Sequence, residues 1–158
     1  MARFSQMPVG DARPARGREA EELIRRAVGR ARERPDVRGL GLVGSRARGT
    51  GSVESDIDLV LLTHDTRSYL EDDGWIQGLA PAVPVAIRQW GRVTERRLAL
   101  ASGLEVDLGI ADDSWAGTRP VDAGTRGVAR SGMVILHDPH GLLAELLGAL
   151  GLASSPMP

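Results

Sequence analysis

Two aspartates, Asp56 and Asp58, stand one residue apart at the start of the most strand-like segment of the chain, DIDLVLLT. Alternate side chains of a strand leave the same face, so both carboxylates point one way while Ile57 and Leu59 point the other. Two carboxylates separated by roughly 6.6 Å of strand can share one divalent cation or bridge two ions about 3.5–4 Å apart. A cation also relieves their mutual repulsion, which reaches about 4 kcal/mol at close range. A solvated strand edge is the alternative interpretation of this pair.

A Gly-Ser pair, Gly44 and Ser45, closes the preceding strand and opens a turn-rich stretch. Glycine lets a phosphate approach the backbone, serine can cap a short helix, and the free amides there attract anions. Arg46 and Arg48 add positive charge beside this turn. Only ten residues separate Ser45 from Asp56, too few for a parallel crossover, so we expect antiparallel strands with the turn beside the carboxylates. Such a site suits a nucleoside triphosphate with magnesium.

A third acid is expected on a neighbouring strand, about 4.8 Å away. Asp107, which stands between two hydrophobic residues in LEVDLGI, is the first choice, and Glu105 on the same face is the reserve. Pairing across the turn at 101–103 would place Arg97 opposite Asp107. A cross-strand ion pair is therefore the alternative interpretation of Asp107.

Residue types that the sequence lacks exclude several kinds of site. There is no cysteine, which excludes disulfides, thiolate metal sites and cysteine nucleophiles. All 20 basic residues are arginine, so no mechanism can use a lysine. The segment 44–50 has the glycines of a P-loop without its lysine. The segment 56–62 starts like an EF-hand loop but continues as a hydrophobic strand.

The composition is that of one folded domain. The chain has 158 residues, of which 42% are hydrophobic and 26% charged, with a formal net charge of −1. The near-neutral charge argues against bulk binding of nucleic acid. No apolar run approaches the roughly 20 residues of a membrane span, and the first residues lack the apolar core of a secretory signal. We therefore expect a cytoplasmic protein that does not act at a membrane.

Hydrophobic periodicity suggests a flexible arm over 1–17, one domain over 18–150 and a flexible tail over 151–158. Helices are expected from about Gly17 to Pro35, weakly over 69–79, and over the leucine-rich segment 142–150, while 112–132 is ambiguous. The expected strands are 37–43, 56–63, 83–90, 94–100, 104–111 and 133–137.

The sequence resembles the nucleotidyltransferases of the DNA polymerase beta superfamily, most closely the minimal, stand-alone bacterial kind. The superfamily signature is Gly-Ser, about ten residues, Asp-x-Asp, and a later acid between two hydrophobic residues. Here it reads Gly44-Ser45, Asp56-Ile57-Asp58 and Val106-Asp107-Leu108, within residues 37–111. The resemblance implies an α/β (α+β) domain whose mixed, mostly antiparallel sheet is flanked by helices. It also implies transfer of a nucleoside monophosphate from a triphosphate to an acceptor hydroxyl, with release of pyrophosphate.

By position, the resemblance makes Asp56, Asp58 and Asp107 the catalytic and metal-binding residues. The first two would hold two magnesium ions, and Asp107 would complete the ion nearer the acceptor. Ser45 and the amide beside it would bind the outer phosphates, joined by Arg48 at the superfamily's basic position. Arg46 falls where the superfamily varies and is the weaker candidate. ATP is the expected donor, with AMP as the transferred group.

The sequence leaves the acceptor open. Larger members build the acceptor pocket with a helical C-terminal domain, whereas here it would need a second subunit, a partner protein, or the loops at 64–75 and 112–132. Trp115, in the second loop, is the best candidate for stacking on a base, with core packing as the alternative. A helical partner protein as acceptor, as for antitoxins that nucleotidylate a paired toxin, competes with a small molecule such as an aminoglycoside. A third hypothesis is a non-catalytic module that binds a helical partner.

Overall fold

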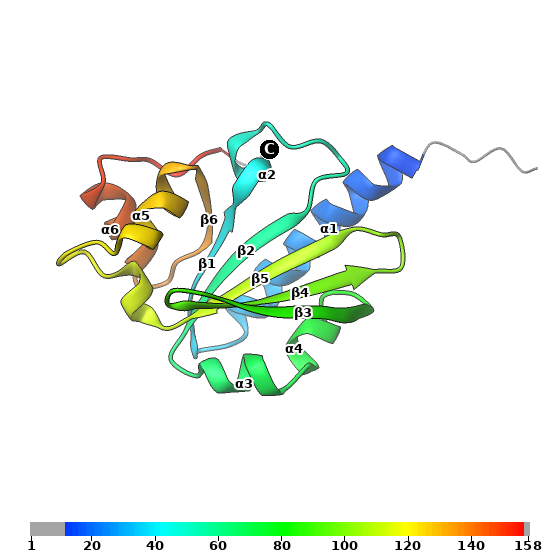
Figure 1. The fold of residues 1–158 in the computed structure, drawn as a ribbon, viewed down its shortest axis with the longest axis horizontal. Coiled ribbons are helices and arrows are strands. Elements are labelled where there is room, and N and C mark those ends of the chain that lie inside the picture. Colours follow the sequence, from blue (N-terminus) through cyan, green and yellow to red (C-terminus); the bar gives the residue numbers. More distant parts are fainter. Residues whose placement is uncertain (1–11, 157–158) are drawn as a thin grey trace, which may run out of the picture.

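The computed structural model describes residues 12–156, with side chains from residue 15 onward, and is built around a six-stranded sheet. Its strand order is β3-β4-β5-β2-β1-β6 (Figure 1). The strands are β1 (Val37–Val43), β2 (Ile57–Thr63), β3 (Ala82–Trp90), β4 (Val93–Leu100), β5 (Glu105–Ala111) and β6 (Met133–His137). The helices are α1 (Ala12–Arg32), α2 (Gly44–Arg48), α3 (Thr66–Glu71), α4 (Gly74–Gln77), the 3-10 helix η1 (Asp113–Ala116), α5 (Ala123–Arg130) and α6 (Leu142–Ala149). Within this part of the chain, no helix combines the length and the apolar character needed to cross a membrane.

Neighbouring strands are antiparallel except at the centre of the sheet, where β2 runs parallel to β5. The antiparallel pairing of β1 with β2 confirms the expectation from their short connection. Between β2 and β5 the chain passes through α3, α4 and the β3–β4 hairpin, which gives the length that a parallel pair requires. The result is the expected fold class, a mixed and mostly antiparallel sheet flanked by helices.

The two faces of the sheet are covered differently. On one face, Ile57, Leu59 and Leu61 of β2 join a large apolar cluster with residues of α1, α3 and α4. On the other face, Val60 and Leu62 pack with η1, α5 and α6. Figure 1 shows α5 and α6 beside β6, and α3 and α4 beside β3 and β4. The acidic start of β2 therefore lies on the face whose helices gather at one end of the sheet.

The bounds and number of the helices differ from the sequence-based expectation in three places. α1 begins at Ala12 and so includes the last part of the expected arm over 1–17, the rest of which lies outside the described residues. Pro14 falls in its first turn, where the missing N–H of proline has no intrahelical partner to lose. The weak helix over 69–79 is replaced by two short helices, α3 and α4, and the ambiguous stretch 112–132 contains η1 and α5.

The C-terminal segment packs against the sheet. One side of α6 is buried in the second apolar cluster, so its leucine stripe serves the core. After α6, the N–H of Ser155 donates to the Met133 carbonyl (2.8 Å), and Ser154 Oγ accepts from the N–H of Ile135 (2.9 Å). The part of the expected flexible tail that the structure describes is thus hydrogen-bonded to β6.

Candidate active site

The parallel pair at the centre of the sheet places two of the predicted acids side by side. Asp58 of β2 and Asp107 of β5 are register partners, so their side chains leave the same face. The nearby charge of Asp107 is one of the causes that raise the pKa of Asp58. Asp107 is only 7% exposed. Asp56 comes directly before β2, with its side chain 41% exposed. The structure thus brings the signature acids to one region of one face.

Gly44 opens α2 next to these acids. Its φ is +75°, in the left-handed region that glycine adopts readily and other residues rarely do. A Cβ at this position would overlap Oδ2 of Asp58. The turn and the close approach of the carboxylate therefore both require glycine here.

Ser45 anchors the loop that follows α2 through its backbone. Its carbonyl oxygen accepts hydrogen bonds from the N–H groups of Thr50 (3.1 Å) and Gly51 (3.0 Å). Its half-buried side chain lies beside Gly51, where an added Cβ would come within 3.1 Å of Oγ. Binding of phosphate by the Ser45 side chain stays a prediction.

The two arginines of α2 point to different neighbours. Arg46 donates to the carbonyl oxygen of Ser55 from Nε (3.0 Å) and Nη2 (2.8 Å), and to that of Val53 (3.2 Å). Arg48 reaches the other way, with Nη1 3.4 Å from the carbonyl oxygen of Ser131 after α5. Arg46, the weaker candidate in the sequence, is therefore the residue that ties down the loop before β2.

Arg97 of β4 is the partner of the third acid. It lies opposite Asp107 in the antiparallel ladder, and its Nε and Nη2 donate to Oδ1 and Oδ2 of Asp107, both at 2.7 Å. Its guanidinium is also 3.3 Å from Glu105 Oε2 and 3.9 Å from Asp56 Oδ2. The cross-strand ion pair is therefore present on the same face as Asp58. The ion-pair interpretation of Asp107 is thus confirmed, while its role in metal binding and catalysis stays a prediction.

Burial and neighbouring acids raise the pKa values of Asp58 and Asp56. Burial, followed by the charges of Asp107 and Asp56, raises the pKa of Asp58 to about 6. Burial also raises the pKa of Asp56, followed by the charges of Glu105 and Asp107, while Arg97 opposes the increase. A cation favours the ionised form of carboxylates crowded in this way. Within residues 12–156, however, no three or more His, Asp or Glu side chains are arranged to hold a metal ion.

A cavity of about 630 Å³ adjoins the acids. Asp58 and Asp107 border it, together with Gly44, Arg48, and residues of α5 and the β3–β4 hairpin. This volume lies within the range of small-molecule sites. Of the two loops expected to complete a site, 112–132 contributes to this cavity, whereas residues of 64–75 pack in the apolar cluster on the opposite face.

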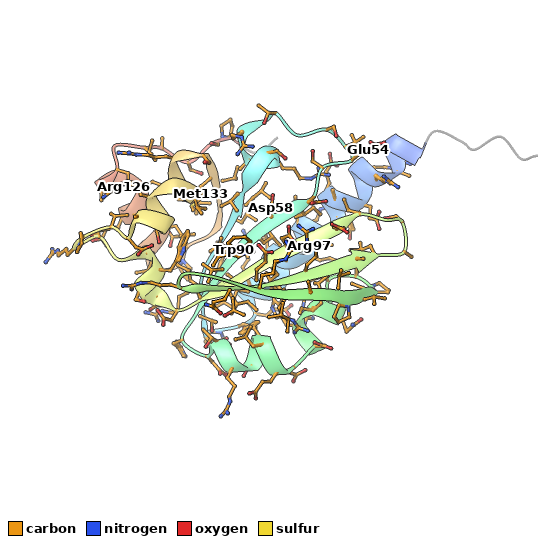
Figure 2. All side chains as sticks on the ribbon, viewed as in Figure 1. Glu54, Asp58, Trp90, Arg97, Arg126 and Met133 are labelled. Carbon is orange, nitrogen blue, oxygen red and sulfur yellow. The ribbon has the colours of Figure 1, made fainter. Side chains whose placement is uncertain are left out.

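Trp90 borders the cavity, although the sequence favours packing in the core or at an interface for this residue. It is 59% exposed at the end of β3, where the hairpin turns. Figure 2 shows it in the same central region of the sheet as Asp58 and Arg97. Trp115 is only 2% exposed and belongs to the second apolar cluster, so its main role is packing. The position of Trp90 directly before Gly91, at a hairpin turn, was the available signal.

One family model matches the chain over more than half of its length. Its description is "Nucleotidyltransferase domain", and the match covers residues 24–114, which include every acid described above. No curated protein matches the chain.

Several solved structures are similar over part of the chain. A cytoplasmic RNA terminal U-transferase is 24% identical with a TM-score of 0.42, covering 63% of this chain and 29% of its own. Cid1, an RNA terminal uridylyl transferase, is 20% identical with a TM-score of 0.43, covering 61% and 30%. Cid1 in complex with the UTP analog UMPNPP is 18% identical with a TM-score of 0.40, covering 74% and 35%. The chain thus spans about a third of the length of these proteins.

Proposed function

The chain belongs to the nucleotidyltransferase domain family, and we propose that it transfers a nucleoside monophosphate from a triphosphate to an acceptor hydroxyl, with pyrophosphate leaving. The observation that carries the proposal is the meeting of Asp58 and Asp107 on one face, beside the positive-φ turn at Gly44. Phosphoryl transfer depends mainly on positioning the phosphates and stabilising their charge. Acids that can hold cations, next to backbone that a phosphate can approach, supply both requirements.

Nucleotidyltransferases of this superfamily generally use a divalent metal, and the acids of this chain fit one. Asp58 forms no ion pair among the described residues, and the nearest partner of Asp56 is Arg97 at 3.9 Å. Burial and the charges of neighbouring acids raise the pKa values of both aspartates. A bound cation would stabilise their ionised forms and so offset this unfavourable free energy. We propose magnesium, with one ion on Asp56 and Asp58 and a second at Asp107 after Arg97 has released it. Magnesium would neutralise charge on the phosphates.

The cavity beside the acids fits the donor nucleotide. Gly44 and Arg48, two of the predicted nucleotide-binding residues, border it. We place the phosphates at this end, close to Ser45. The base would lie toward Trp90, whose exposed ring offers a stacking surface. ATP is the proposed donor and AMP the transferred group.

A hydroxyl on a partner protein fits as acceptor better than a small molecule. One nucleotide-sized ligand would fill the cavity beside the acids. A second cavity, of about 660 Å³, lies between α1 and the loop around Val53, and none of the acids borders it. Within the described residues, a small acceptor would therefore have no pocket of its own at the acids. A protein can instead present its hydroxyl from outside the cavity.

The proposal is tested by incubating the protein and magnesium with each labelled nucleoside triphosphate and a lysate of its own cells. RNA and an aminoglycoside serve as separate acceptors, and release of pyrophosphate is measured in parallel. We expect ATP to label one protein, and Asp58→Asn to abolish the label. Label on RNA or on the aminoglycoside would replace the proposed acceptor. Absence of both pyrophosphate and calorimetric binding of ATP would overturn the enzyme proposal in favour of a non-catalytic binding module.

A further inference from the structure

Arg97 occupies the centre of the acid cluster on the open face. It holds both oxygens of Asp107 at 2.7 Å, in the parallel two-bond geometry that fits a guanidinium to a carboxylate. The same guanidinium is 3.3 Å from Glu105 and 3.9 Å from Asp56. Three carboxylates of the cluster therefore share one permanent positive charge, because arginine does not lose its proton in proteins. Among these acids only Asp58 has no ion pair with it.

A metal ion at Asp107 would compete with this guanidinium. Magnesium binds carboxylate oxygens directly, at about 2.0–2.1 Å, and places two positive charges there. Arg97 already engages both Asp107 oxygens, and its side chain is 24% exposed against 9% for that of Asp107. Little water is available to screen the repulsion between a guanidinium and a metal ion held by the same carboxylate. Asp56, with a side chain 41% exposed, lies 3.9 Å from Arg97 without a two-bond contact, so this competition is weaker there.

We propose that Arg97 takes the place of a cation at Asp107, so that the protein without nucleotide binds one divalent ion, at Asp56 and Asp58. Asp107 accepts an ion only after Arg97 leaves it. The inference rests on the proposed function, since it concerns the metal site of that reaction. In this proposal Arg97 is a positioning residue: the first ion binds while Arg97 holds Asp107, and the second binds only after Arg97 has moved away.

The number of bound ions tests this directly. Manganese has the coordination preferences of magnesium and an electron paramagnetic resonance signal that disappears on binding, so the full chain is titrated with Mn²⁺ without nucleotide. We expect one bound ion in the wild-type protein and two in Arg97→Gln. The double variant with Asp107→Asn should return to one, because the added ion needs that carboxylate. Two ions in the wild type, or one in Arg97→Gln, would overturn the inference.

A second measurement does not depend on the folding of an Arg97 variant. If Arg97 occupies Asp107, then Asp107→Asn should leave the affinity for the first Mn²⁺ within about threefold of the wild type. Asp56→Asn should weaken it by about 100-fold or more. Equal losses in the two variants would contradict the proposal. Arg88→Gln, which removes an exposed positive charge from neighbouring β3, is the matched control and should keep one ion.

The two proposals fail separately. If one ion binds as expected but no nucleotide is transferred, the proposed function fails and the placement of Arg97 stands. If transfer occurs but the wild type binds two ions without nucleotide, the inference about Arg97 fails alone. Absence of bound Mn²⁺ in both the wild type and Arg97→Gln would overturn the inference about Arg97, and the transfer assay would still decide the proposed function.

Discussion

Replacement of Asp58 by asparagine should stabilise the ion-free protein while abolishing its reaction. Burial and the neighbouring acids raise the pKa of Asp58 to about 6, from an ordinary value of 3.8. This difference corresponds to at most about 3 kcal/mol of unfavourable free energy in the ionised form. The carboxyl keeps some contact with water, so we expect about 1–2 kcal/mol from the substitution. Asparagine has a similar shape and can still donate a hydrogen bond to Asp107.

The sign of the effect follows from proton linkage. Because the pKa of Asp58 is higher in the folded state, the group favours folding below about pH 4 and loses this contribution as the pH rises through about 6. Urea unfolding with a chelator should therefore show similar stabilities for wild type and Asp58→Asn near pH 4. The variant should be more stable at pH 7.5. Adding magnesium should stabilise the wild type, by about 2.7 kcal/mol at 100 times the dissociation constant, and leave the variant unchanged.

Asp36→Asn is the control with the opposite sign. Burial alone would raise the pKa of Asp36, but hydrogen bonds from Tyr69 (2.6 Å), Arg34 (2.9 Å) and Thr63 (3.0 Å) outweigh it and lower the pKa. Its contribution to stability is present at neutral pH and is lost as the pH falls through the folded-state value. The substitution should therefore destabilise the protein at pH 7.5, by about 1–3 kcal/mol. If Asp58→Asn were also destabilising at pH 7.5 without metal, the account of the acid cluster would be refuted.

Four further variants separate the parts of the site. Gly44→Ala should lose about 1–3 kcal/mol in urea unfolding and nearly all transfer activity, because the side chain is strained at positive φ and overlaps Asp58. Trp90→Ala should raise the KM for ATP with little change in the free energy of unfolding, because the side chain is exposed beside the cavity. Trp115→Ala, at a buried side chain, should lower the free energy of unfolding by about 3–5 kcal/mol. Equal losses of stability in the two variants would contradict the assignment of Trp90 to the cavity. Arg46→Gln should make the loop before β2 more susceptible to proteolysis, because the hydrogen bonds to the carbonyl oxygens of Ser55 and Val53 are lost. An unchanged cleavage pattern would argue that these bonds do not hold the loop in place.

The sequence predicts those parts of the site that depend on alternation and on short turns. The two-residue period of a strand puts Asp56 and Asp58 on one face, and the tight turn after β4 fixes Arg97 opposite Asp107. The short link between β1 and β2 forces them to be antiparallel. Each of these inferences needs only residues close together in the chain.

Contacts between distant segments were not predictable in the same way. The parallel pairing of β2 with β5 brings Asp58 beside Asp107 across a long excursion of the chain, and no local pattern encodes that register. Residues of α5 line one side of the cavity, and their position depends on how the segment 112–132 packs against the sheet. Trp90 is exposed because it stands at the end of a hairpin. From the sequence pattern alone, a hydrophobic residue in a strand is expected to be buried. An arginine side chain such as that of Arg46 can reach several hydrogen-bond acceptors. Which of them it contacts depends on the conformation of the packed loop, which the sequence pattern does not give.

The two faces of the sheet show that the acid cluster is not there to stabilise the fold. On the covered face, Arg96 pairs with a single acid, Asp73 (2.5 Å), and also donates to the carbonyl oxygen of Tyr69 (3.1 Å). On the open face four carboxylates gather, and among the described residues Arg97 alone pairs with Asp107 and also reaches two of the others. Partly buried charges of one sign destabilise a domain, and apolar or neutral residues would serve the fold better. The proposed binding of cations would account for the surplus negative charge, and the proposed transfer reaction needs such cations, whereas a purely protein-binding surface does not.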